Sequence, residues 1–191
     1  MARKNKYFPA IQRQLPSHCG PTSLSLALAI LMGKYISPRT LAREGGRPVS
    51  AFWEGLNDKE LSCAARKHSV RVRHVFLRKR GEGMSFIRTV REHVIHKGPA
   101  VVLAWDFEHW VCVIAYRNGK FIVRDPDKDP RILNSWSPET LKRVAWNAEY
   151  NDEDSESEPD QYFALLITRK DGKLPAVTVD SRFLRRCKKE G

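Results

Sequence analysis

The sequence has no long hydrophobic run. Its most apolar stretch, SLSLALAILMG at residues 23–33, is shorter than the about 20 residues that cross a bilayer as a helix. The N-terminal stretch MARKNKYFPAIQRQ is basic but contains no apolar segment of the kind found in secretion signals. We therefore expect no membrane segment and no secretion signal, and a cytoplasmic protein.

Cysteine is also scarce. The four cysteines, Cys19, Cys63, Cys112 and Cys187, are widely spaced and form no CxxC pair. This spacing argues against a structural zinc site and against a disulfide framework, and it fits free thiols in a reducing compartment. We expect neither a bound metal nor a cofactor.

Acidic residues are few outside one segment. Lys and Arg number 34 against 22 Asp and Glu, a net charge of +12, yet seven carboxylates fall in EYNDEDSESEPD at residues 149–160. We expect this segment to be a surface loop and the basic tail, residues 180–191, to be solvated. Such a charge is compatible with nucleic acid as a partner, but no aromatic-basic motif supports it, so a peptide or protein substrate is favoured. The oligomeric state is left open.

The order of patterns predicts an α+β fold. The 191 residues suit a single domain with a core at about 10–170. Apolar spacing and capping residues predict helices over about 21–34, 37–46, 54–69, 84–98 and 137–147. Runs of β-branched and aromatic residues predict strands at 70–76, 99–105, 109–116, 120–126 and 162–169. Helices therefore dominate the first half, and they are expected to pack on an antiparallel sheet formed mainly by the second half.

Cys19 lies where the first long helix is expected to begin, in the stretch QLPSHCGPTSLSLAL. The unpaired N–H groups and the dipole at a helix N-terminus favour a thiolate over a thiol. Gly20 allows a substrate to approach closely, and Pro21 sacrifices no hydrogen bond in the first turn. A structural cysteine is more typical of the middle of an apolar face, as at Cys63 and Cys112. Cys19 is therefore the candidate nucleophile.

His109 is the candidate base, because it opens an apolar strand after a short break. His93 and His96 lie on a predicted amphipathic helix and are expected at its surface or in packing. The Asn118-Gly119 turn predicts a hairpin in which residue i lies opposite about 237 − i. His109 then falls opposite position 128, at the same end of the hairpin as Asp125, so the two are expected to pair.

An oxyanion site needs donors near the nucleophile. A glutamine shortly before Cys19 can act with the Cys19 backbone N–H; Gln14 is the first candidate and Gln12 the second. Gly20 and Trp110 are expected to line the substrate side of the cleft. Trp105 and Trp136 are expected in the core or in a cleft wall.

Three of these stretches resemble a known family. QLPSHCGPTSLSLAL, HWVCVIAY and FIVRDPD together resemble papain-like cysteine peptidases of the bacteriocin-processing, double-glycine leader peptidase type, in their stand-alone form without transporter domains. The resemblance covers about residues 10–150. It implies a papain-like fold with Cys19 as nucleophile, His109 as base and Asp125 as its orienting partner. One position departs from the pattern: the glutamine usually found six residues before the cysteine is replaced by Arg13, with Gln14 and Gln12 on either side.

The resemblance and the residues together predict a cysteine peptidase that cleaves through a Cys19 thioester. A deamidase or an acyltransferase would use the same residues. A non-catalytic module that binds a peptide or nucleic acid through the basic surface is the third alternative, and the presence of all three residue types argues against it.

Overall fold

The computed structural model describes residues 18–46, 55–105, 108–128, 133–148 and 161–177. The helices are α1 (Cys19–Met32), α2 (Pro38–Glu44), α3 (Asp58–Arg66), α4 (Gly83–His96) and α5 (Pro138–Val144), with a 3-10 turn at Arg80–Glu82. The strands are β1 (Val70–Leu77), β2 (Ala100–Ala104), β3 (His109–Arg117), β4 (Lys120–Arg124), β5 (Asn134–Trp136), β6 (Trp146–Asn147) and β7 (Gln161–Arg169).

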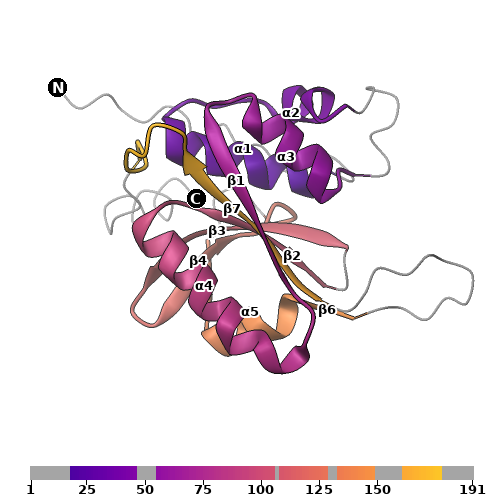
Figure 1. Ribbon diagram of the computed structural model, residues 1–191, viewed down its shortest axis with the longest axis vertical. Helices are drawn as coiled ribbons and strands as arrows, with labels where there is room; N and C mark the ends of the chain where they lie inside the picture. The colour runs from indigo at the N-terminus through magenta and orange to yellow at the C-terminus, as the bar shows by residue number, and fades with distance from the viewer. Residues whose placement is uncertain (1–17, 47–54, 106–107, 129–132, 149–160, 178–191) are drawn as a thin grey trace, which may run out of the picture.

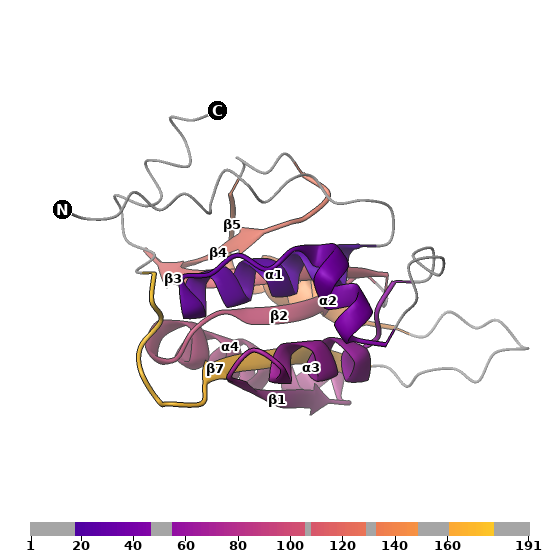
Figure 2. The ribbon, with the colours of Figure 1, turned by 90° about the horizontal axis from the view of Figure 1, so that it is seen from above.

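A single antiparallel sheet separates two layers of helices. Its strand order is β1-β7-β2-β3-β4-β5, with β6 paired to β7. Helices α1, α2 and α3 lie on one side and α4 and α5 on the other (Figures 1 and 2). Each side buries its own apolar cluster against the sheet. The expected α+β fold, with helices before an antiparallel sheet, is confirmed.

Local capping explains where the helices begin. Ser37 and Ser137 each accept a hydrogen bond from the backbone N–H three residues later and are followed by Pro at the first helical position. Asn57 caps α3 through a reciprocal capping box with Glu60. These caps fix the first turns of α2, α3 and α5.

Several element boundaries differ from those expected. Helix α1 begins at Cys19, not at Pro21 or Thr22, because the first turn of a helix needs no donor from proline. It ends at Met32, where Gly33 adopts a left-handed conformation with φ 66. Helix α5 ends at Val144, where the expected helix over 137–147 gives way to β6.

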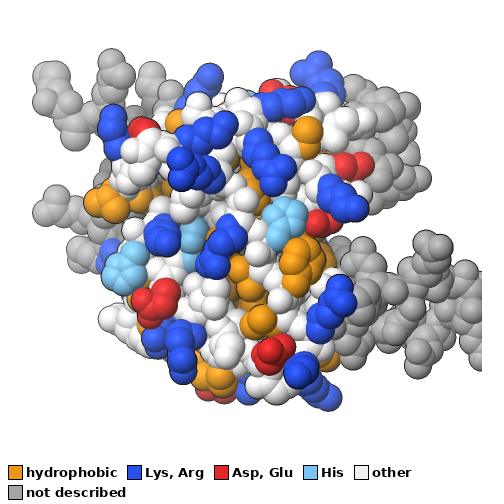
Figure 3. Space-filling view, in the orientation of Figure 1, with side chains coloured by type: hydrophobic (Ala, Val, Ile, Leu, Met, Phe, Trp, Pro, Cys, Tyr) orange, Lys and Arg blue, Asp and Glu red, His pale blue; other side chains and the backbone are white. Residues whose placement is uncertain are grey.

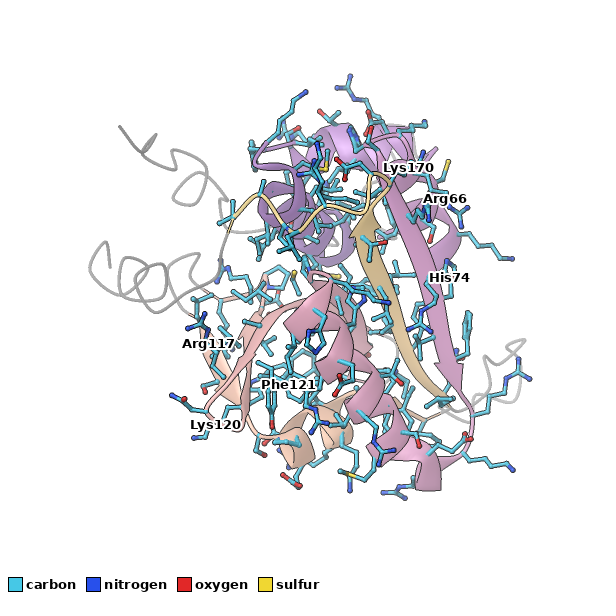
Figure 4. The ribbon with its side chains drawn as sticks, turned by 60° about the vertical axis from the view of Figure 1, so that its left-hand side comes forward. Arg66, His74, Arg117, Lys120, Phe121 and Lys170 are labelled. Atoms are coloured by element: carbon cyan, nitrogen blue, oxygen red, sulfur yellow. The ribbon has the colours of Figure 1, made fainter. Side chains whose placement is uncertain are left out.

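The sheet joins strands that are distant in sequence. Strand β1 pairs with β7 along its whole length, from Val70 opposite Arg169 to Leu77 opposite Tyr162. The last strand, β7, therefore lies inside the sheet, between β1 and β2. Lys170, which follows β7, donates to the carbonyl of Arg66 at the end of α3 (3.4 Å), and both residues are marked beside β1 in Figure 4.

Helix α1 is held at both ends, by the sheet near its start and by the segment after β7 at its end. Near its start, Ser23 Oγ donates to the Trp110 carbonyl of β3 (2.9 Å). At its end, the backbone N–H groups of Ala176 and Val177 donate to Leu31 and Ile30 carbonyls, both at 3.0 Å. No helix in the described part of the chain is both long and apolar enough to span a membrane.

Candidate active site

The candidate nucleophile is the first residue of α1. Cys19 is 9% exposed and has Gly20 and Pro21 after it in the first turn. A Cβ on Gly20 would lie 3.1 Å from side-chain carbons of both Leu61 and Trp110, closer than nearly all real contacts. Glycine at this position therefore lets the helix start pack tightly between α3 and β3. The N-terminal amides of α1 are oriented toward the region where a negative charge on sulfur or oxygen would form.

The candidate base and its partner meet as the hairpin predicts. His109 is the first residue of β3, and Asp125 directly follows β4. The Nε2 atom of His109 lies 2.8 Å from Asp125 Oδ1, and both side chains are buried. The same carboxylate oxygen accepts the backbone N–H of Asp127 at 3.0 Å. Asp125 is thus held by a turn while it fixes the plane of the imidazole.

The hairpin register contains one irregularity. Arg117 pairs with Lys120 and Ala115 with Ile122, as expected from the tight turn, whose Asn118 and Gly119 both have positive φ (50 and 74). Between Val113 and Ala115 the register shifts. This bulge moves the position opposite His109 from 128 to 127 and leaves Asp125 at the same end of the hairpin.

Two hydrogen bonds hold the start of α1, the start of β3 and the segment before α3 together. Ser23, one turn after Cys19, bonds the carbonyl of Trp110, the residue after His109. Trp110 in turn donates its indole N–H to the Leu56 carbonyl at 3.2 Å. Because both bonds are buried, the start of α1 and the start of β3 keep a fixed relation. They bring the side chains of Cys19 and His109 together.

The electrostatics of the site favour a positively charged His109. Burial lowers the pKa of His109, but hydrogen bonds with Asp125 and with the Cys19 thiol, and the negative charges of both, raise it to about 9. Burial works in the same way against ionised Asp125, yet the bond from His109 and that from the Asp127 backbone hold the pKa of Asp125 below its usual value. An imidazolium between a carboxylate and a thiol is the arrangement that stabilises a thiolate.

The other described cysteines have different surroundings. Burial raises the pKa of the Cys112 thiol far above its ordinary value, so Cys112 is an inert core residue. The expectation that Cys63 lies in an apolar face is wrong, because its side chain is on the exposed side of α3.

The remaining predicted site residues divide into two groups. Gly20 and Trp110 lie beside one another next to Cys19, and both are buried; their contact with substrate stays a prediction. Gln14, Gln12, the acidic segment 149–160 and the basic tail 180–191 lie outside the described residues.

Two side chains at His109 were not singled out as site residues from the sequence. The Trp105 ring lies 5.2 Å from the His109 ring, centroid to centroid, and Asp127 Oδ2 lies 3.6 Å from His109 Nδ1. The DPD stretch was a usable signal for Asp127, since its two carboxylates flank the proline after β4. The donor atoms of His109, Asp125 and Asp127 lie within 4.8 Å of one another, so these three could share a metal ion. The bond between His109 and Asp125 equally suits proton transfer.

Comparison with known proteins finds one peptidase family and solved structures of peptidases. The profile of the Peptidase_C39 like family matches residues 5–152. A double glycine motif protease from an AMS/PCAT transporter, solved in complex with the leader peptide, superposes with a TM-score of 0.57 at 16% identity, over 88% of this chain and 96% of that one. The peptidase domain of Streptococcus ComA, a bi-functional ABC transporter involved in a quorum sensing pathway, gives a TM-score of 0.52 at 17% identity, over 83% and 96%. A search of curated proteins finds no match.

Proposed function

Because the chain belongs to the Peptidase_C39 like family and is a papain-like cysteine peptidase, we propose that it hydrolyses a peptide bond through a thioester on Cys19, with His109 as general base and acid and Asp125 orienting His109. The observation that carries this proposal is the Cys19 side chain at the start of α1, hydrogen-bonded to a His109 whose Nε2 is held by Asp125 at 2.8 Å.

The two nitrogens of His109 have separate tasks in this scheme. Nε2–H donates to Asp125 throughout, so Nδ1 is the nitrogen that exchanges a proton with Cys19 and with the leaving group. The Cys19 thiolate attacks the substrate carbonyl carbon, and Nδ1–H then gives its proton to the departing amine. In the second half Nδ1 removes a proton from water, the resulting hydroxide attacks the thioester carbonyl, and the acid product leaves as Cys19 is released.

The tetrahedral intermediates carry a negative oxygen that needs donors. The backbone N–H of Cys19 is the first donor, because it belongs to the unpaired N-terminal turn of α1. We assign the second donor to a glutamine before the helix, with Gln14 ahead of Gln12.

A peptide or protein is the substrate in this proposal, in line with the solved relative that holds a leader peptide. A cytoplasmic location is also proposed. It is supported by Cys19, Cys63 and Cys112, which are all free thiols within the described residues.

Alkylation tests the activated thiol directly. We expect iodoacetamide at pH 6 to modify Cys19 at least about tenfold faster than Cys63, because an ordinary thiol is almost fully protonated at that pH. Peptide mapping by mass spectrometry gives both rates in one sample, with the exposed Cys63 as the internal control. Equal rates at Cys19 and Cys63, or a Cys19 rate unchanged by His109→Ala, would show that the proposed pair is wrong.

Peptide hydrolysis tests the reaction itself. The protein and its Cys19→Ala variant are incubated with a proteome-derived peptide library, and new termini are identified by mass spectrometry. New termini that depend on Cys19 support hydrolysis. Glutamine converted to glutamate, or acyl groups moved to added amines, without new termini would instead assign the deamidase or acyltransferase chemistry.

A further inference from the structure

Two side chains that are partly exposed to solvent, Trp105 and Asp127, lie against the imidazole of His109. Trp105 is 38% exposed and its ring lies 5.2 Å from that of His109. The side chain of Asp127 is 53% exposed, and its Oδ2 lies 3.6 Å from His109 Nδ1. The carboxylate therefore lies close to the nitrogen that the proposed mechanism uses for proton transfer, and the aromatic ring contacts the same imidazole.

The fold fixes the position of Trp105. Its backbone has φ 52, a conformation that is unusual for a bulky aromatic residue. The Trp105 N–H donates to the Val144 carbonyl at 2.9 Å, and its ring meets the ring of Trp136 edge to face at 5.7 Å. Strained residues of this kind gather at ligand-binding sites, where the surrounding structure maintains them. The indole is thus a fixed wall.

The charge next to Trp105 is negative, whereas the net charge of the whole protein is positive. Lys and Arg outnumber Asp and Glu by 34 to 22, and Lys and Arg side chains are spread over the face shown in Figure 3. Among the described residues, however, Asp127 lies against His109 and Glu108 precedes it in the chain, and both acidic residues are exposed. Lys128 is the basic neighbour of Asp127, and its backbone N–H donates to the Asp125 carbonyl.

The proton transfer to the leaving group determines which part of a substrate lies next to Trp105 and Asp127. A general acid must come within hydrogen-bond distance of the amine that departs. The residue that carries this amine, the first on the leaving-group side of the cleaved bond, consequently lies next to His109 and to the groups around it. We propose that Trp105 and Asp127 form the subsite for that residue, and that the subsite prefers a basic side chain, arginine or lysine. This inference rests on the proposed function of Cys19 and His109.

The two contacts suit a cation together. An indole face attracts a guanidinium or ammonium group, and a nearby carboxylate attracts the same group by its opposite charge. Each contact is modest at a partly exposed site. Together they give an expected preference in kcat/KM of about tenfold for a basic over an acidic residue.

The test uses peptides that the wild-type protein cleaves in the library experiment. From one such peptide, matched versions are made with Arg, Lys, Gln or Glu as the first residue after the cleaved bond. We expect kcat/KM to be about tenfold higher for Arg and Lys than for Glu, with the difference mainly in KM. Asp127→Asn should reduce this ratio to about two, and Asp127→Lys should bring it below one. Glu92→Gln, which removes an exposed carboxylate of α4, is the matched control and should leave the ratio unchanged.

The indole is tested in the same assay. Trp105→Phe keeps an aromatic face and should retain most of the preference for Arg, whereas Trp105→Leu should lose it. Should a Trp105 variant fail to fold, the half-exposed Asp127 variants still decide the matter.

Equal kcat/KM for the Arg and Glu peptides, or a preference that Asp127→Lys leaves intact, would overturn the subsite. Such a result leaves the proposed function standing, because the peptides are still cleaved. Absence of any Cys19-dependent cleavage, by contrast, would overturn the proposed function and this inference together.

Discussion

Two regions of the molecule hold a nucleophilic side chain, a histidine and an aspartate in contact. One is Cys19, His109 and Asp125. The other lies on α3 and β1, where Ser62 Oγ is 2.7 Å from His74 Nε2 and His74 Nδ1 is 3.4 Å from Asp58 Oδ2. Figure 4 marks His74 on β1, the strand at the edge of the sheet. By residue type and distance alone, the second region resembles a catalytic triad.

The positions of the nucleophiles distinguish the two regions. Cys19 begins α1, where backbone amides are available to an oxyanion. Ser62 lies in the interior of α3 and is 1% exposed, so its neighbouring amides are already used within the helix. His74 therefore ties α3 to the sheet edge, whereas His109 joins the start of α1 to the adjacent ends of β3 and β4. A triad of residue types becomes a site only where the nucleophile has both access and an oxyanion donor.

The largest expected effect is a difference in peptidase activity between variants of His109 and His74. His109→Ala should lower kcat/KM for a cleaved peptide by about a thousandfold, because it removes the proposed general base and acid. His74→Ala should leave kcat/KM within about threefold of wild type, since His74 supports packing alone. Both variants are assayed on the same peptide after circular dichroism confirms folding. A loss of similar size in both would mean that the two regions do not differ as described.

A third histidine extends the comparison to stability. His93 of α4 is buried and faces two carbonyl oxygens, those of Pro99 and Ile167, both at 3.2 Å. Burial lowers the pKa of His93 to about 4, the opposite of the shift at His109, where the hydrogen bonds with Asp125 and Cys19 and their negative charges together outweigh burial. The folded state then binds fewer protons than the unfolded state between pH 6.5 and 4.

The contribution of neutral, buried His93 to the free energy of unfolding is present above pH 6.5. It is lost as the pH falls toward 4, by an amount on the order of 3 kcal/mol. His93→Gln should flatten this dependence of the unfolding free energy, measured in urea. His96→Gln, which changes an exposed histidine of the same helix, should preserve it. An unchanged slope in His93→Gln would assign the acid sensitivity elsewhere.

Removing the partner of His109 should change the pH profile of Cys19. Asp125→Asn takes away a bond and a charge that raise the pKa of His109 to about 9. The histidine then loses its proton at lower pH, so the alkaline limb of the peptidase profile should move down from about 9. At pH 8 the rate should fall about tenfold. Asp58→Asn, the equivalent change at His74, should leave the profile in place; a shift with Asp58→Asn would contradict the separation.

The smallest expected effect lies in the second region. Ser62→Ala removes one hydrogen bond to His74 and should lower the free energy of unfolding by about 1 kcal/mol. Cys19 alkylation and peptide cleavage should be unaltered. A Ser62→Ala variant that folds normally but no longer cleaves would give Ser62 a role in the reaction.

The parts of this site that sequence could predict depend on short-range signals. Asn118 and Gly119 fix a tight turn, and this turn brings His109 to Asp125 although sixteen positions separate them. The proline after Gly20 marks the start of α1 and hence the position of Cys19. The expectation for His109 and Asp125 as neighbours is therefore confirmed by geometry, and their catalytic roles stay a proposal.

The rest depends on contacts that local patterns do not encode. The pairing of β1 with β7 joins residues 85 to 99 positions apart. The short strands β5 and β6 form by pairing with β4 and β7 and carry no periodic signal. Ser23 looks like any small residue of a buried helix until its bond to Trp110 is seen. The contact of the Trp105 ring with His109 accompanies a backbone conformation that its residue type does not favour.

The place of β7 inside the sheet affects when this protein becomes an enzyme. A nascent chain emerges from its N-terminus, so Cys19, His109 and Asp125 are all made before Gln161–Arg169. Until that strand inserts, β1 has no partner along its length and β2 lacks one of its two neighbours. Pairing across such sequence distances is slow and comes late in folding. Proteolytic activity should therefore be withheld during translation, and a cell making this protein would be exposed to it only once synthesis has passed β7.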